Sequence, residues 1–167
     1  MPGMLATCEW LEHTWWATGI RQSIWMFPII ETIHLFGIVL LVAATTALDL
    51  RLLGISFRER PVSAMAGPLS RWAWVGFIIQ ILSGFLLFAS EASKLYSNTP
   101  FRLKMILIVA AGANILLFHY GVYRTVDRWD ESAIAPAAAR IFGVSSILLW
   151  FGIVAAGRWI AFVSNYR

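Results

Sequence analysis

Four long apolar stretches occupy most of this 167-residue chain. Hydrophobic residues make up 59% of it and charged residues only 13%, a balance far outside that of a soluble globular domain. A helix of about 20 apolar residues crosses a hydrocarbon core of about 30 Å. The sequence therefore predicts a single integral membrane domain over residues 1–167, with transmembrane spans at about 25–48, 71–90, 103–123 and 141–163.

The residues before the first span are predicted to form an interfacial helix over 4–20. Trp10, Trp15 and Trp16 supply amphipathic rings of the kind that lie in the headgroup layer. Small residues such as Gly76 and Gly157 recur within the later spans, where they let helix backbones approach closely. The expected fold class is an all-α membrane protein, a four-transmembrane-helix bundle with an N-terminal interfacial amphipathic helix.

Basic residues predict the orientation of the spans. The connections after the first and third spans, with their flanks, carry seven lysines and arginines against six on the other side. The positive-inside rule makes the first side cytoplasmic. We therefore expect a multi-pass protein of the bacterial inner (plasma) membrane with both termini periplasmic. The positive charges lie at span ends rather than on a solvated face, so the lipid bilayer is the expected partner and nucleic acid is not.

Three ionisable side chains within the spans are the first candidates for a site. Glu31 and His34 lie three residues apart in the first span, on the helix face that continues to Asp49, and Lys104 lies near the start of the third span. A charged group in hydrocarbon costs at least about 2.5 kcal/mol, which makes each a functional candidate. His34 is about 10 Å and Lys104 about 5 Å inside the same membrane edge. We expect them to face the bundle interior together.

His34 and Lys104 each allow two interpretations. His34 is either an axial ligand to haem b, with Glu31 orienting its ring, or a packing histidine that bonds to Glu31 or Thr45. Lys104 is either a second ligand or a partner of a haem propionate. Its alternative role is an anchor that pairs with Glu31 or with a lipid phosphate.

Three further residues are candidates around the same cofactor or at a second site. Arg158, near the end of the fourth span, is expected to contact a propionate or a quinone, or to pair with Glu31 or Glu91. His13 either faces His34 from the interfacial helix or lies among the headgroups. His119 should lie roughly 15 Å from His34 along the membrane normal, so it would hold a second metal site rather than share the first.

The histidine in the first span, followed by Gly37, and a third span that opens on Lys104 and closes on His119 resemble one known superfamily. It contains the copper-resistance membrane protein CopD and the HemJ-type protoporphyrinogen oxidases. The HemJ type uses a first-span histidine and a third-span lysine around b-type haem. The resemblance thus implies a haem or redox site at His34 and Lys104. It does not extend to residues 48–54, and we assign no catalytic residue.

A closer resemblance is to an uncharacterised bacterial family of four-span membrane proteins. Its members share patterns that read here Pro28-x-x-Glu31-x-x-His34-x-x-Gly37, Asp49-Leu-Arg-Leu-Leu-Gly54 and Gly157-Arg158. This resemblance covers nearly the whole chain and implies the four-span fold, but it brings no activity with it.

Together these patterns predict a small membrane protein that binds haem b near the outer leaflet and takes part in electron transfer. It would act as a homo-oligomer or as a subunit of a respiratory or photosynthetic membrane complex. One alternative is an accessory subunit without a cofactor, in which the polar residues form internal ion pairs. Another is copper or small-molecule transport of the CopD type, along a polar path from His34 through Asp49 to His119.

Overall fold

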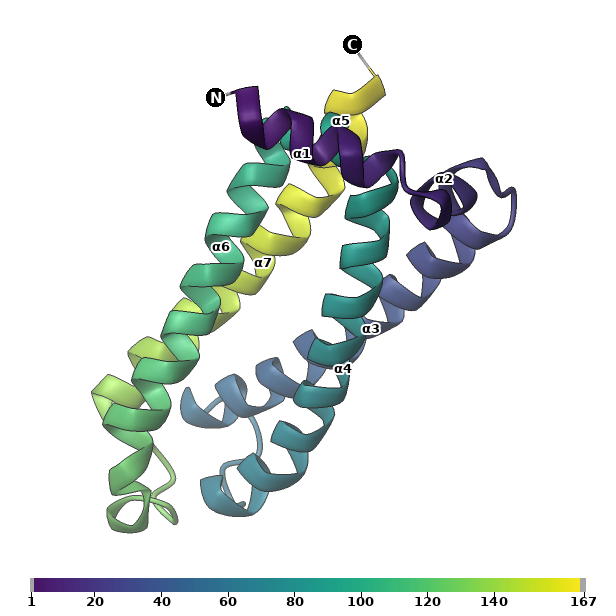
Figure 1. Cartoon of the computed structure of the whole chain (residues 1–167). Coiled ribbons are helices and arrows are strands. Elements are labelled where there is room, and N and C mark those ends of the chain that lie inside the picture. Colours follow the sequence, from purple (N-terminus) through teal and green to yellow (C-terminus); the bar gives the residue numbers. More distant parts are fainter. Residues whose placement is uncertain (1, 166–167) are drawn as a thin grey trace.

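The computed structural model describes residues 2–165, and within this range every regular element is helical (Figure 1). Four helical segments are long and apolar enough to cross a membrane, namely Met26–Leu52, Val62–Ser90, Thr99–Arg128 and Ala137–Val163. The predicted all-α fold with four spans is therefore confirmed. The ends of the predicted domain, residues 1, 166 and 167, lie outside the described residues.

The helices extend further than the apolar stretches alone indicate. Their bounds are α1 Pro2–Glu12, α2 Trp15–Gln22, α3 Met26–Leu52, α4 Val62–Ser90, α5 Ala92–Tyr96, α6 Thr99–Leu117, the π-helical turn η1 Phe118–Val122, the 3-10 helix η2 Tyr123–Arg128 and α7 Ala137–Asn165. The largest difference is in α4, which begins at Val62 rather than near residue 71 and contains Pro68. Proline removes one backbone hydrogen bond from a helix. Pro68 lies only six residues after the start of α4, and the helix continues through it.

The predicted interfacial helix over 4–20 is wrong in one respect, because it is two helices. The helix is interrupted between Glu12 and Trp15. There Thr14 has an extended backbone, and its hydroxyl donates to the Leu11 carbonyl at 2.7 Å. Such a side-chain bond competes with the helical ladder. We call the end of the molecule covered by α1, α2 and α5 the capped end (Figure 1). The opposite end, formed by residues 53–61 and 118–136, is the loop end.

A polar cluster holds the helices of the capped end together. Arg21 of α2 donates to Glu12 of α1 at 2.6 Å, and the other oxygen of Glu12 accepts from the backbone N–H of Ser93 at 3.1 Å and from its hydroxyl. Burial works to raise the pKa of Glu12, but the two bonds from Ser93 and the charge of Arg21 outweigh it and lower that pKa. Glu12 thus links α1, α2 and α5.

The spanning helices pack as two pairs, α3 with α4 and α6 with α7. Glycine permits the closest approach in the first pair: a Cβ added at Gly76 would lie 2.7 Å from the backbone nitrogen of Leu41. A Cβ at Gly37 would meet the side chain of Ile79 at 2.7 Å. The pairs join where α3 meets α7 at the loop end, since a Cβ on Gly143 would lie 3.3 Å from the Asp49 carbonyl. These contacts place small residues at the interfaces, as lipid-embedded packing requires.

Arg51 ties the two connections of the loop end to α3. Its side chain is fully buried and donates to the carbonyls of Arg60 at 2.7 Å, Ser132 at 3.1 Å and Asp130 at 3.3 Å. Beside it lies the main apolar core cluster, made of Leu52, Val62, Val126, Trp129, Ala135 and Ala139. The positive-inside count used Arg51 as a topology signal at a span end, and the structure adds a second role, which is to satisfy loop carbonyls that turn away from solvent.

Candidate functional site

His34 is held by the helix that packs against its own. Its Nδ1 lies 2.9 Å from the hydroxyl oxygen of Ser83 on α4. The same hydroxyl donates its proton to the Ile79 carbonyl one turn earlier, so we infer that it accepts the proton of Nδ1. That tautomer leaves a lone pair on Nε2, which makes no hydrogen bond within residues 2–165.

The surroundings of the imidazole are shaped by α4 as well. A Cβ added at Gly84 would lie 3.2 Å from Cε1 of His34, so glycine makes room for the ring at this level. Gln80 donates its side-chain amide to the His34 carbonyl. Ser83 and Gly84 therefore position the imidazole ring, and Gln80 bonds to the backbone of the same residue.

Lys104 enters the same region from the other helix pair. Its stem and ammonium lie against Gly157 of α7, where an added Cβ would be 3.6 Å from Nζ and 3.8 Å from Cδ and Cε. Its charge acts on the His34 imidazole through space, while no hydrogen bond joins the two side chains within residues 2–165. Toward the capped end, Phe88 of α4 stacks on Phe101 of α6 with their centroids 5.5 Å apart, bridging the two pairs above the lysine. We call His34, Ser83 and Lys104 the histidine–lysine site.

Glu31 does not belong to this site as the sequence led us to expect. Its side chain is exposed, and it forms no hydrogen bond or ion pair with the part of the chain that the structure describes. Neither Glu31 nor Thr45 is the partner of His34: the Thr45 hydroxyl donates to the carbonyls of Leu41 and Val42 in its own helix. The predicted partners were wrong because helix spacing was used to choose them, whereas the imidazole reaches across to α4.

Arg158 and His13 stay apart from the site. Arg158 is exposed and its guanidinium lies over the ring of Phe162, 5.5 Å from the centroid. Its expected ion pairs with Glu31 or Glu91 are not formed, and Glu91 binds Lys94 at 3.2 Å instead. His13 is exposed at the break between α1 and α2, with no bond to His34.

His119 lies at the loop end, in the turn that follows α6, whereas His34 lies in the half of α3 nearer the capped end. It is exposed within the π-helical turn, stacked on Tyr123 at 5.4 Å and edge-on to Tyr120 at 5.6 Å between ring centroids. Among residues 2–165 there is no group of three or more His, Cys, Asp or Glu side chains placed to hold a metal ion by themselves. A second metal site at His119 would therefore need ligands other than the described His, Cys, Asp and Glu side chains.

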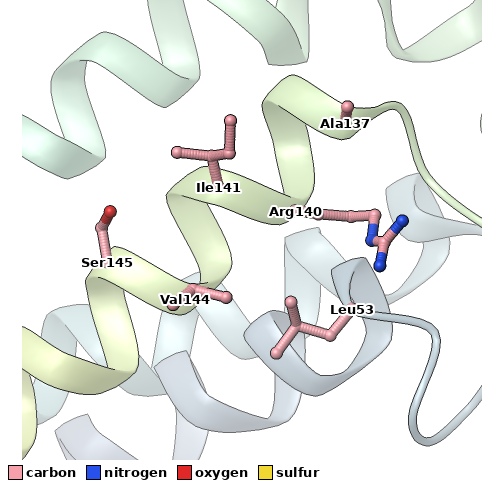
Figure 2. Close-up of a pocket in the computed structure, with 6 residues that line it drawn as sticks. All are labelled: Leu53, Ala137, Arg140, Ile141, Val144 and Ser145. Carbon is pink, nitrogen blue, oxygen red and sulfur yellow. The ribbon is translucent and has the colours of Figure 1, made fainter.

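Two further features lie at the loop end, and one of them is Asp49, which the sequence placed on the same helix face as His34. Asp49 is buried beside Ser146 of α7, and its Oδ2 has no hydrogen-bond partner among the described residues. Next to this contact, a surface hollow opens between the end of α3 and the first turns of α7 (Figure 2). Neither contacts the histidine–lysine site.

Comparison with known proteins gives a family but no activity. Residues 13–163 match a family of unknown function designated DUF6644. The chain belongs to this family. No curated protein and no solved structure matches it. The predicted membership of an uncharacterised family is thus confirmed, and the more distant resemblance to CopD and HemJ proteins finds no support in these comparisons.

Proposed function

We propose that this protein binds haem b at the histidine–lysine site and takes part in one-electron transfer within the membrane. The observation that carries the proposal is the orientation of His34. Its Nδ1 is engaged by Ser83, and its Nε2 is left with a lone pair in a half-buried position. Metal-binding histidines characteristically use one nitrogen for the metal and the other for a fixed hydrogen-bond acceptor.

The donor set suits a porphyrin better than a bare metal ion. A porphyrin supplies its own ring of nitrogen ligands, so the protein need add only axial ligands, and no cluster of three protein ligands is required. Lys104 would either hold the haem iron as a second ligand, through its neutral amine, or neutralise a propionate with its ammonium. Bound haem would supply reversible one-electron oxidation and reduction of iron. Ser83 takes the orienting role first expected of Glu31, and Arg158 and His13 are not needed by the proposal.

The absorption spectrum of the purified protein tests this proposal. Full-length protein is expressed with added haem precursor, purified in mild detergent and examined for a Soret band. We expect a band that shifts on reduction, and we expect His34→Ala to abolish it. The matched control is His119→Ala, because that exposed histidine lies at the opposite end of the bundle.

A wild-type preparation that lacks a Soret band, and whose titration with haem gives only the spectrum of free haem, would overturn the proposal. It would favour the alternative of an accessory subunit in which His34 only fixes the packing of α3 on α4. A haem band that survives His34→Ala but disappears in His119→Ala would place the cofactor at the loop end instead.

We also propose that the capped end, with both chain termini, faces the periplasm of a bacterial inner membrane. The support is the excess of basic residues at the loop end and its flanks, seven against six. In that orientation the histidine–lysine site lies toward the outer leaflet, where it would exchange electrons with a periplasmic partner or a neighbouring subunit.

A further inference from the structure

The hollow at the loop end has an apolar wall formed by the first turns of α7 and by Leu53, the residue after α3. It is lined by Leu53, Ala137, Arg140, Ile141, Val144 and Ser145. Figure 2 shows the side chains of Leu53 and Val144 directed toward one another across the hollow, with the Arg140 guanidinium on the Leu53 side of α7. Ile141 and Val144 are 64% and 47% exposed, so this wall is open to whatever surrounds the helices.

The depth of the hollow is set by the ends of its helices. The first span ends at Leu52, immediately before Leu53, and the fourth begins at Ala137, one turn before Arg140 and Ile141. The hollow therefore lies where the hydrocarbon core meets the headgroups. Its apolar wall is at the level of acyl chains, and its guanidinium is at the level of phosphates.

The charge at the rim is positive and unpaired. Arg140 is exposed, and its side chain makes no hydrogen bond or ion pair with residues 2–165. A second guanidinium is held nearby, since Arg58 donates through Nε to the carbonyl of Gly54, the residue after Leu53. None of the six described residues that line the hollow is acidic. Of the nearby acids, Asp49 is buried against Ser146, and Asp130 accepts hydrogen bonds from Ser63.

We propose that this hollow binds an anionic phospholipid. Its acyl chain lies along Leu53, Ile141 and Val144, and its phosphate binds the guanidinium of Arg140. Arginine recognises phosphate through paired N–H donors, and basic pockets between spanning helices bind anionic headgroups. The occupant is a membrane lipid rather than a soluble phosphate because the apolar wall opens toward the bilayer at the depth of its chains.

Native mass spectrometry of lipid retention tests the headgroup contact. Detergent-purified protein is equilibrated with equal amounts of phosphatidylglycerol and phosphatidylcholine of identical chains, and the lipids retained on the folded protein are counted. We expect a preference for phosphatidylglycerol of roughly five-fold, the ratio that one arginine contributes at an anionic surface. Arg140→Gln should remove it, while Arg124→Gln, at an exposed arginine of η2 outside the hollow, should leave it intact.

A second pair of variants tests the apolar wall. Val144→Trp should fill the hollow and reduce retention of both lipids, whereas Leu148→Trp, one turn further along α7 and also exposed but outside the hollow, should not. Equal retention of the two lipids by the wild type would overturn the proposal. So would a preference that persists in Arg140→Gln, because the headgroup would then be selected by groups other than the Arg140 guanidinium.

Discussion

His34 illustrates how one hydrogen bond changes the meaning of a polar residue in a membrane helix. An imidazole bonded within its own helix would be a packing device, whereas the bond to Ser83 aligns the ring across the α3–α4 interface. Because the serine hydroxyl already donates to the Ile79 carbonyl, it also selects the tautomer. The proposed haem ligand therefore depends on a serine that carries no chemistry of its own.

Ser83→Ala should accordingly weaken haem binding without removing it. Loss of a bond to the outer nitrogen of a metal-binding histidine typically costs about 10–100-fold in metal affinity. Haem titration followed by absorption spectroscopy measures the change. Thr45→Ala is the matched control, because that hydroxyl bonds only to carbonyls of α3. Weakening by Thr45→Ala, with Ser83→Ala unaffected, would contradict the assigned orientation of His34.

The α3–α4 pair depends on glycines at the crossing rather than on large apolar side chains. Inside a bilayer, apolar side chains gain little by leaving lipid for a neighbouring helix, so close backbone contact and polar bonds must hold the pair. Gly76 permits that contact, since a Cβ there would meet the backbone of α3 at 2.7 Å. Gly112 of α6 differs, because nothing would lie within 4 Å of its added Cβ.

Gly76→Leu should therefore destabilise the folded protein by about 1–3 kcal/mol or more, the usual cost of overpacking where backbone must move. Gly112→Ala should be neutral or stabilising by up to about 1 kcal/mol, because alanine is the better helix former. Reversible unfolding in mixed micelles, followed by circular dichroism, gives both free energies. Equal effects of the two substitutions would show that the crossing tolerates the added side chain.

At each end of the bundle, a different buried or half-buried polar residue joins neighbouring segments through hydrogen bonds. Arg51 joins α3 to both connections at the loop end, and Glu12 joins α1, α2 and α5 at the capped end. The helix pairs meet through α3 and α7 near the loop end. The histidine–lysine site lies nearer the capped end, where Phe88 and Phe101 bridge the pairs. All of α1, including Cys8, then lies on one side of the membrane and the basic connections on the other.

The single cysteine, Cys8, makes this orientation measurable. If the capped end is periplasmic, a thiol reagent that cannot cross the inner membrane should label Cys8 in cells with a permeable outer membrane. A variant combining Cys8→Ser with Glu59→Cys, at an exposed position of the loop end, should be labelled only after the inner membrane is opened. The reverse pattern would show that the basic residues mark the other side.

The number and approximate position of the spans could be predicted because hydropathy is a property of each segment alone. His34 and Lys104 were identified for a related reason, since an ionisable group in an apolar run is conspicuous wherever it lies. The finer boundaries were harder: Thr14 breaks the interfacial helix through a local side-chain bond, and Pro68 is accommodated inside α4. Thr14 adds a side-chain bond and Pro68 lacks a backbone donor, and composition reveals neither effect on the helix boundary.

The amino-acid sequence alone determined that this chain forms membrane-spanning helices and which polar groups those helices must accommodate. Only the tertiary structure decided the partners of those groups. It paired His34 with Ser83 rather than Glu31, and it buried Arg51 among loop carbonyls. The physical reason is that a partner across an interface depends on the rotation, depth and crossing of two helices. Those quantities are fixed by close packing at residues such as Gly37 and Gly76, far apart in the chain.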